Sequence, residues 1–162
     1  MIRIRPLTTA DADAIADIYA YYVLHTTATF DTEPPRSWED VIMKLPFDGT
    51  YPAFVCVADG VVAGYCYAHP WKERSAYRYT LETTVYLRPD HTRRGYGRIL
   101  MERLIDACRD QGYHALVACI TVPNEASTAL HERLGFRRVS HFAEVGRKFG
   151  RWLDVADYEL ML

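Results

Sequence analysis

The sequence predicts an α+β protein in which helices cover the faces of one mixed β-sheet. Three observations lead to that prediction: several short β-rich runs, one two-residue hairpin signal, and segments with an apolar stripe at helical spacing between them. The 162 residues are 49% hydrophobic and 25% charged, which is the balance of one globular domain spanning residues 1–162. A core of that size needs neither a metal nor a disulfide to hold it together.

The first part of the chain predicts a strand and then a helix. Residues 2–7 alternate apolar and polar side chains, which is typical of a half-buried strand. Thr8 and Asp11 have the spacing of a capping box, and apolar side chains then recur at helical spacing to about His25.

A loop and a shorter helix follow. Residues 26–36 have no periodic pattern, so we expect a loop there. A second capping box, Ser37-x-x-Asp40, predicts a helix that ends near Leu45.

Three strands come next. Residues 54–58 and 61–69 are β-rich and are separated by Asp59-Gly60, which predicts an antiparallel hairpin. Residues 79–87 predict a third strand with alternating faces. Glu82 lies in the middle of that strand, where a charged side chain is unusual.

The second half begins with the clearest helix. Its apolar stripe consists of Gly97, Leu100, Met101, Leu104, Ile105 and Cys108. Gln111-Gly112 ends this helix, and the almost wholly apolar run 115–122 predicts a strand covered on both faces.

The last part predicts one more helix and two strands. Asn124 is expected to cap a short helix that ends at Leu134-Gly135. Two strands, near 137–145 and 152–161, flank an expected turn at 146–150.

Charge and cysteine spacing exclude several classes of function. The formal charge is −2, so the molecule has no strong attraction for polyanions, and we expect no nucleic-acid partner. The longest apolar runs are far shorter than the roughly 20 residues that a membrane span requires, so we expect no membrane partner. The four cysteines lack metal-site spacing, which predicts reduced core thiols in a cytoplasmic protein: Cys56, Cys66, Cys108 and Cys119.

A glycine-bearing loop joins the strand 79–87 to the helix with the clear stripe. Gly95 and Gly97 allow the backbone to come close to a ligand, and the first helical turn has N–H groups free to bind an anion. Arginines at 93, 94 and 98 add positive charge, so a diphosphate fits the loop. The alternative is a simple helix start with solvated arginines. The loop lacks both the P-loop pattern and the third glycine of a dinucleotide fingerprint.

Two stretches of this region resemble the GNAT acetyltransferase superfamily. Thr92-Arg-Arg-Gly-Tyr-Gly97 is similar to the superfamily's Q/R-x-x-G-x-G/A motif, which holds the pyrophosphate of acetyl-CoA, and departs from it only at Thr92. The run from Asn124 to Phe136 resembles the superfamily's N-x-x-[AS]…[YH]-x-x-x-G-F stretch. The resemblance implies the GNAT fold, with a mixed, mostly antiparallel, twisted sheet of about seven strands and helices on both faces.

The same resemblance implies acetyl-CoA as cosubstrate, without a metal, and a set of residues that bind it. These are Val85, Tyr86, Leu87, Arg93, Arg94, Gly95, Tyr96, Gly97, Arg98, Asn124, Ser127 and Arg133. The alternatives are that Asn124 only caps its helix, that Ser127 only supports the cap, and that Arg133 is only solvated.

A narrower resemblance covers essentially the whole chain. The segment 70–86 shares the P-W-K-x-R-x-A-Y and E-[ST]-T-V-Y patterns of the phosphinothricin N-acetyltransferase family. The run Phe149 to Asp154 resembles relatives that acetylate methionine sulfone or sulfoximine. The resemblance implies a homodimer that acetylates the α-amino group of a small amino-acid analogue by direct attack.

The chemistry of that reaction points to two catalytic residues. An α-amino group is mostly protonated at neutral pH, so it must lose a proton before it attacks a thioester, and Glu82 is the expected base. Its alternative role is a salt bridge to Arg78 or to another neighbour in the sheet. His131 is expected to protonate the leaving thiolate or to assist Glu82, although a lone helical histidine is often structural.

Five further residues are predicted to bind the acceptor. Lys72 and Arg74 offer cations to its phosphinate or carboxylate, Phe30 and Tyr77 offer an apolar wall, and Thr84 offers a hydrogen bond. The alternative is a set of solvated loop charges beside core aromatic residues.

Two rival functions remain open from the sequence. One is an acetyltransferase for a peptide N-terminus or a polyamine, although the basic loop with Lys72 and Arg74 does not suit a polyamine. The other is a non-catalytic acyl-CoA sensor, which would need neither Glu82 nor His131.

Overall fold

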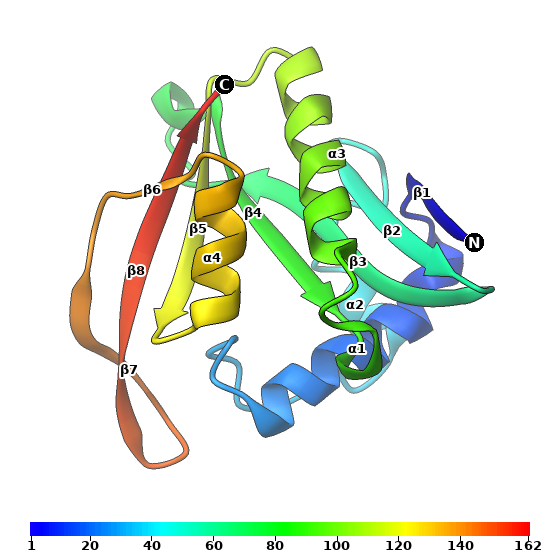
Figure 1. Ribbon diagram of the computed structural model, residues 1–162, viewed down its shortest axis with the longest axis horizontal. Helices are drawn as coiled ribbons and strands as arrows, with labels where there is room; N and C mark the ends of the chain where they lie inside the picture. Colours follow the sequence, from blue (N-terminus) through cyan, green and yellow to red (C-terminus); the bar gives the residue numbers. More distant parts are fainter.

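The computed structural model describes all 162 residues, which form an eight-stranded mixed sheet with helices on both faces (Figure 1). The strand order is β1-β2-β3-β4-β5-β8-β6, and β7 also pairs with β8. Every pairing is antiparallel except that of β4 with β5. The strands are β1 (Ile2–Pro6), β2 (Ala53–Ala58), β3 (Val61–Pro70), β4 (Thr80–Leu87), β5 (Ala115–Val122), β6 (Arg137–Arg138), β7 (Phe142–Lys148) and β8 (Arg151–Met161).

Four α-helices and three short 3-10 turns connect the strands. The helices are α1 (Ala12–His25), α2 (Trp38–Ile42), α3 (Tyr96–Asp110) and α4 (Glu125–Arg133), and the turns are η1 (Thr9–Asp11), η2 (Ser75–Tyr77) and η3 (Pro89–His91). None of the helices is both long and apolar enough to cross a bilayer.

Alternate side chains of the sheet build two cores. Phe54 and Cys56 of β2 pack in a cluster with the buried stripe of α3, whereas Val55 packs with Ile15 and Ile18 of α1 on the opposite face. This alternation follows from the two-residue period of a strand. The predicted α+β class with helices on both faces is therefore confirmed.

Two local signals in the sequence form as predicted. The Thr8 N–H donates to the Asp11 carboxylate at 2.9 Å, which completes the capping box before α1. Asp59 and Gly60 both adopt positive φ, as a two-residue hairpin turn requires.

Three boundaries differ from the prediction. The helix after Ser37 ends at Ile42 rather than near Leu45, and its capping box does not form because the Asp40 carboxylate accepts the Arg36 N–H at 2.9 Å. The expected strand 137–145 is two strands, β6 and β7, separated by residues 139–141, which contact β8 without forming a regular ladder. The turn after β7 is shorter than expected because Gly146 still lies within that strand.

The feature that positions the site is a divergence of two neighbouring strands. The parallel pairing of β4 with β5 spans only 80–82 and 115–117. Beyond Glu82, β4 stays paired with β3, and β5 stays paired with β8. Figure 1 shows β4 and β5 moving apart toward the end of β4, with α4 beside the opening.

Candidate active site

A cavity of about 1120 Å³ fills the opening between β4 and β5. Side chains from both faces of β4 line it, Thr83 and Val85 from the α3 side, and Glu82 and Thr84 from the α1 side. The cavity therefore connects the two faces of the sheet, and a ligand on one face can reach a ligand on the other.

The start of α3 supplies unpaired hydrogen-bond donors to this cavity. Gly95 precedes the helix with φ of 81°, a left-handed conformation that favours glycine. The first helical bond is from the Ile99 N–H to the Gly95 carbonyl at 3.2 Å, so the N–H groups of 95–98 have no protein partner. A helix N-terminus with free N–H groups is the arrangement that suits an anion.

The arginines around this helix start fall into two groups. Arg93, Arg98 and Arg133 line the cavity, although Arg98 Nε also lies 2.7 Å from the Glu102 carboxylate. Arg94 does not line it, because its guanidinium donates to the Asp90 carbonyl at 3.2 Å.

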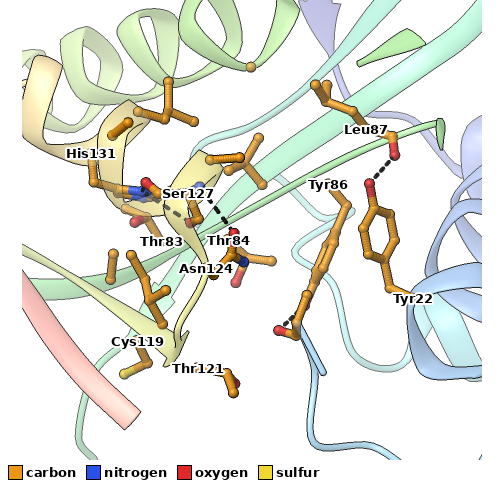
Figure 2. A pocket seen from close by; sticks show the side chains of 18 of the residues that line it. Tyr22, Thr83, Thr84, Tyr86, Leu87, Cys119, Thr121, Asn124, Ser127 and His131 are labelled. Carbon is orange, nitrogen blue, oxygen red and sulfur yellow. Dashed lines mark hydrogen bonds between the residues drawn. The ribbon is translucent and has the colours of Figure 1, made fainter. Parts of the chain in front are cut away.

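The other residues expected to bind the cofactor differ in whether their side chains line the cavity. The Tyr96 side chain packs on the α3 core, which leaves only its backbone N–H on the anion site. Val85, Tyr86, Leu87 and Gly97 all line the cavity. The Leu87 carbonyl accepts the Tyr22 hydroxyl at 2.5 Å (Figure 2), which uses one of the two lone pairs of that oxygen.

Two polar residues of α4 lie on the same side. The Asn124 side chain accepts the Ser127 N–H at 3.2 Å, so Asn124 caps the helix as predicted, and both residues also line the cavity. The cap therefore does not exclude contact with a ligand, because the Asn124 amide NH₂ has no protein partner.

His131 is a buried histidine of α4 that borders the cavity. Its side chain is packed edge to face on Phe136, and only 4% of the residue is exposed. Nδ1 lies 2.8 Å from the Ser127 carbonyl oxygen, which can only accept, so Nδ1 carries the proton and Nε2 keeps a lone pair. Burial lowers the pKa of His131, which makes the neutral imidazole its form at neutral pH.

The α1 side of the cavity is enclosed by a loop and by tyrosines. Ala28, Thr29 and Phe30 of the loop after α1 line the cavity. Phe30 is therefore one of the predicted acceptor residues that border it. The Tyr86 ring lies 4.9 Å from that of Tyr22 on α1.

The β7–β8 hairpin holds this loop in place. The buried Lys148 ammonium of β7 donates to the Thr29 carbonyl at 2.8 Å. Gly146 faces the Phe30 ring so closely that an added Cβ would lie 2.3 Å from a ring carbon. Both contacts fix the loop that carries Phe30.

Glu82 is at the point where the two strands separate. Its side chain is 26% exposed, and Oε2 lies 3.9 Å from Nε2 of His69 on β3. Arg78 does not pair with it, because the Arg78 guanidinium donates to the Ser75 carbonyl and the Tyr79 hydroxyl. The salt bridge to Arg78 is therefore not formed, whereas a neighbour in the sheet, His69, does lie within salt-bridge distance of Glu82.

Cys119 corrects the prediction that all four cysteines lie in the core. Cys56, Cys66 and Cys108 are buried, but Cys119 is exposed and lines the cavity. Desolvation raises the pKa of the Cys119 thiol, and the nearby carboxylates of Asp157 and Glu82 raise it further. The thiol is therefore protonated at neutral pH and is a poor nucleophile.

Cys119 gives a direct test of the cavity's accessibility. We expect N-ethylmaleimide to modify Cys119 slowly and before the three buried cysteines, and peptide mass spectrometry to locate the adduct. A Cys119→Ser variant is the control and should remain unmodified in its folded state. Modification of Cys56, Cys66 or Cys108 ahead of Cys119 would contradict this arrangement.

Other lining residues were not singled out from the sequence. The Thr83 hydroxyl is buried in the cavity wall without a hydrogen-bond partner, so it is available to a ligand. Thr121 of β5 also lines the cavity (Figure 2). The alternation of side chains along a strand is the signal that could have identified them, since both residues lie on strands that border the opening.

Three predicted acceptor residues lie elsewhere. Lys72, Arg74 and Tyr77 line a separate hollow of about 500 Å³ with Glu73. β3 continues to Pro70, so the loop that follows it leaves the sheet at the start of β4, where β4 and β5 are still paired. A single chain therefore does not bring these residues to the cavity, whereas it does bring Thr84 there.

Comparison with known proteins agrees with this geometry. Residues 15–136 match the model of the acetyltransferase (GNAT) family. A phosphinothricin N-acetyltransferase of Streptomyces viridochromogenes is 41% identical, and the match covers 98% of this chain and 89% of that protein. An L-methionine sulfoximine/L-methionine sulfone acetyltransferase of Salmonella typhimurium is 42% identical over 94% of this chain and 90% of that protein.

Solved structures agree with the sequence matches. A phosphinothricin acetyltransferase of Sinorhizobium meliloti, solved in complex with acetyl-CoA, superposes with a TM-score of 0.94 at 33% identity and covers 99% of this chain and 88% of its own. A putative acetyltransferase of Salmonella typhimurium, solved with acetyl-CoA, has a TM-score of 0.94 at 38% identity over 99% of this chain and 94% of its own.

Proposed function

Because the chain belongs to the GNAT family of acetyltransferases, we propose that its 162 residues form a single catalytic domain acting on a small amino-acid analogue. The domain transfers acetyl from acetyl-CoA to the α-amino group of phosphinothricin or a similar compound. Methionine sulfoximine or sulfone is the alternative acceptor, since relatives at 41% and 42% identity carry the two names. The observation that carries the proposal is the cavity through the sheet, with anion-binding N–H groups on one face and Glu82 on the other.

The α3 side of the cavity suits the coenzyme. The free N–H groups of 95–98 and the arginines at 93 and 98 match the two phosphates of its diphosphate. The edge of β4 beyond Glu82 has no strand partner toward β5, so its backbone groups are available to the pantetheine amides. Arg133 borders the same side and is the proposed contact for the adenosine phosphate.

The α1 side suits the amine, and Glu82 is the proposed catalytic base there. The Glu82 carboxylate takes a proton from the ammonium group, and the free amine then attacks the thioester carbonyl. A backbone N–H near Tyr86 or Leu87 polarises that carbonyl. The new C–N bond forms first and gives a tetrahedral intermediate, and the C–S bond breaks when this intermediate collapses.

His131 is the proposed second catalytic group. In its neutral form Nε2 has a lone pair that can take the remaining proton from nitrogen and pass it to the departing thiolate. The same atom acts as a base first and as an acid second, so both roles considered for this residue are combined.

The transfer is direct rather than through an acyl-enzyme. The exposed thiol in the cavity, Cys119, is held protonated by its surroundings. The cavity also allows both substrates to bind at once, and holding two reactants together contributes up to roughly 7–11 kcal/mol in well-oriented reactions.

A panel of acceptors tests the proposal. We expect acetyl-CoA with phosphinothricin, methionine sulfoximine or methionine sulfone to release free thiol, and spermidine to release none. Calorimetry with coenzyme A alone separates the other class of function, because an acyl-CoA sensor would bind the coenzyme yet turn over no acceptor. No binding of the coenzyme would exclude both functions.

The hollow with Lys72 and Arg74 remains a proposed contact for the acceptor's anionic groups, completed by a second subunit. We expect Arg74→Ala to raise KM for the acceptor about tenfold or more while KM for acetyl-CoA changes less than twofold, since a charged hydrogen bond contributes about 1.5–3 kcal/mol. Steady-state titration of each substrate measures this. Equal changes in both KM values would remove Arg74 from the acceptor site.

We also propose that the protein is a cytoplasmic homodimer. The four free cysteines suit a reducing compartment. The β7–β8 hairpin exposes apolar side chains that a partner would cover, namely Val145, Phe149 and Trp152, which are 54–59% exposed. Light scattering coupled to size exclusion should give twice the chain mass, and Trp152→Glu should shift it toward the monomer.

A further inference from the structure

His69 lies beside Glu82 and has no role in the proposed reaction. The two residues face each other across the antiparallel pair β3–β4, and His69 Nε2 lies 3.9 Å from Glu82 Oε2. Glu82 lines the cavity and His69 does not, and 37% of the His69 side chain is exposed to solvent. We propose that His69 carries the acceptor's proton from Glu82 to solvent. This inference rests on the proposed function of Glu82.

The tautomer of His69 is set by its neighbour. Nδ1 lies 3.1 Å from the Pro70 carbonyl oxygen, which can only accept, so Nδ1 carries a proton. In a neutral imidazole the Nε2 lone pair then points to the Glu82 carboxyl group. That contact is favourable when the pair holds one proton, either on the carboxyl oxygen or on Nε2, because a lone pair beside a carboxylate is repulsive.

The proton balance of the reaction requires that one proton leave Glu82 in each turnover. An ammonium group has three N–H bonds and the amide product has one, so nitrogen loses two protons in each turnover. One of them ends on the thiol of coenzyme A. The other must leave the protein before Glu82 can act again, and its path is Glu82 Oε2 to His69 Nε2 and then to water, while Nδ1–H is retained.

The other titratable groups near the pair do not provide this path. Tyr67 precedes His69 on the same face of β3, and desolvation raises the pKa of its hydroxyl. Cys119 on β5 and Asp157 on β8 lie on the far side of Glu82, and the Cys119 thiol stays protonated. His69 is the remaining group, and its imidazole has one ring nitrogen toward Glu82 and a side chain partly exposed to solvent.

The distance is longer than a hydrogen bond, which limits what the pair does without substrate. An N···O separation of 3.9 Å is beyond the 2.7–3.2 Å of a normal contact. Catalytic hydrogen bonds are often long in a ligand-free protein and shorten when substrates bind. The relay requires the two atoms to come within that distance when the acceptor binds.

Two variants separate proton transfer from simple positioning of Glu82. His69→Gln keeps a group that can hydrogen-bond to Glu82 but cannot carry a proton, and His69→Ala leaves space for added imidazole. We expect kcat with phosphinothricin to fall about tenfold in both variants, with KM for acetyl-CoA unchanged. Added imidazole should restore kcat of His69→Ala in proportion to its concentration and leave the wild type unchanged.

The control is His141→Gln, since His141 is also a half-exposed histidine next to a carboxylate, that of Asp154 at 2.8 Å. It should retain the wild-type kcat. Wild-type kcat in His69→Gln, or no rescue of His69→Ala by imidazole, would overturn the relay. Wild-type protein that acetylates none of the acceptors would instead refute the proposed function, so the two failures are distinct.

Discussion

We expect Glu82→Gln to lower kcat by about 10²- to 10⁴-fold, the range for loss of a general base. Glutamine has nearly the same shape as glutamate but accepts no proton at neutral pH, so the acceptor's ammonium group stays charged and does not attack. Calorimetry should show unchanged affinity for coenzyme A, because the anion-binding N–H groups lie on the other face of the sheet. Some activity should remain, because the cavity still holds both substrates together.

The pH dependence of this variant gives a second readout. An α-amino group ordinarily titrates at a pH of about 8, so the fraction of free amine rises as pH rises through that value. The rate of Glu82→Gln should therefore approach that of the wild type above about pH 9, because less of the amine then needs a base. A deficit that stays constant across this range would show that Glu82 has a structural role instead.

A matched control excludes a general effect of charge loss. Glu39 is an exposed glutamate on α2 outside the cavity, and Glu39→Gln should retain wild-type kcat at every pH.

His131→Asn is expected to lower kcat as well, but without the recovery at high pH, because the proton that His131 carries goes to the thiolate rather than to solvent.

The parts of the fold with a local cause were predictable from the sequence. The stripe of α3, the turn at Asp59-Gly60 and the cap at Asn124 each depend on residues close in the chain, and all three form as expected. The comparisons confirm the predicted family. The GNAT fold and its mostly antiparallel sheet are confirmed as well.

The parts that depend on long-range geometry were not predictable. Cys119 has the pattern of a core residue in an apolar strand, and it is exposed only because β4 diverges from β5 beyond Glu82. The residues close to a strand in the chain do not determine where its parallel pairing ends. The position of Arg74 was not predictable for the same reason. The length of β3 determines at which end of the sheet the following loop begins.

Gly64 connects the stability of the sheet to the cavity. It lies on β3 opposite Leu87 at the diverging end of β4. An added Cβ would lie 2.4 Å from Leu87 Cδ2 and 2.9 Å from the Tyr86 carbonyl oxygen. The leucine side chain can rotate away, but the backbone oxygen cannot, so β3 and β4 would have to move apart.

We expect Gly64→Ala to lower the free energy of unfolding by about 1–3 kcal/mol, the usual cost of overpacking a well-packed site. For a chain of this length each kcal/mol lowers Tm by about 2–4 °C, which differential scanning calorimetry resolves. KM for acetyl-CoA should rise as well, because Tyr86 and Leu87 form one wall of the cavity. Both effects have one cause, a displaced end of β4.

Gly97→Ala is the control for stability. An added Cβ there would lie 3.5 Å from the Leu87 and Leu130 side chains, which is ordinary contact, and the backbone needs no positive φ. This variant should unfold at or slightly above the wild-type temperature, since alanine favours a helix more than glycine does. Equal Tm values for Gly64→Ala and the wild type would show that β3 and β4 can separate at no cost, and the wall of the cavity would then be mobile rather than fixed.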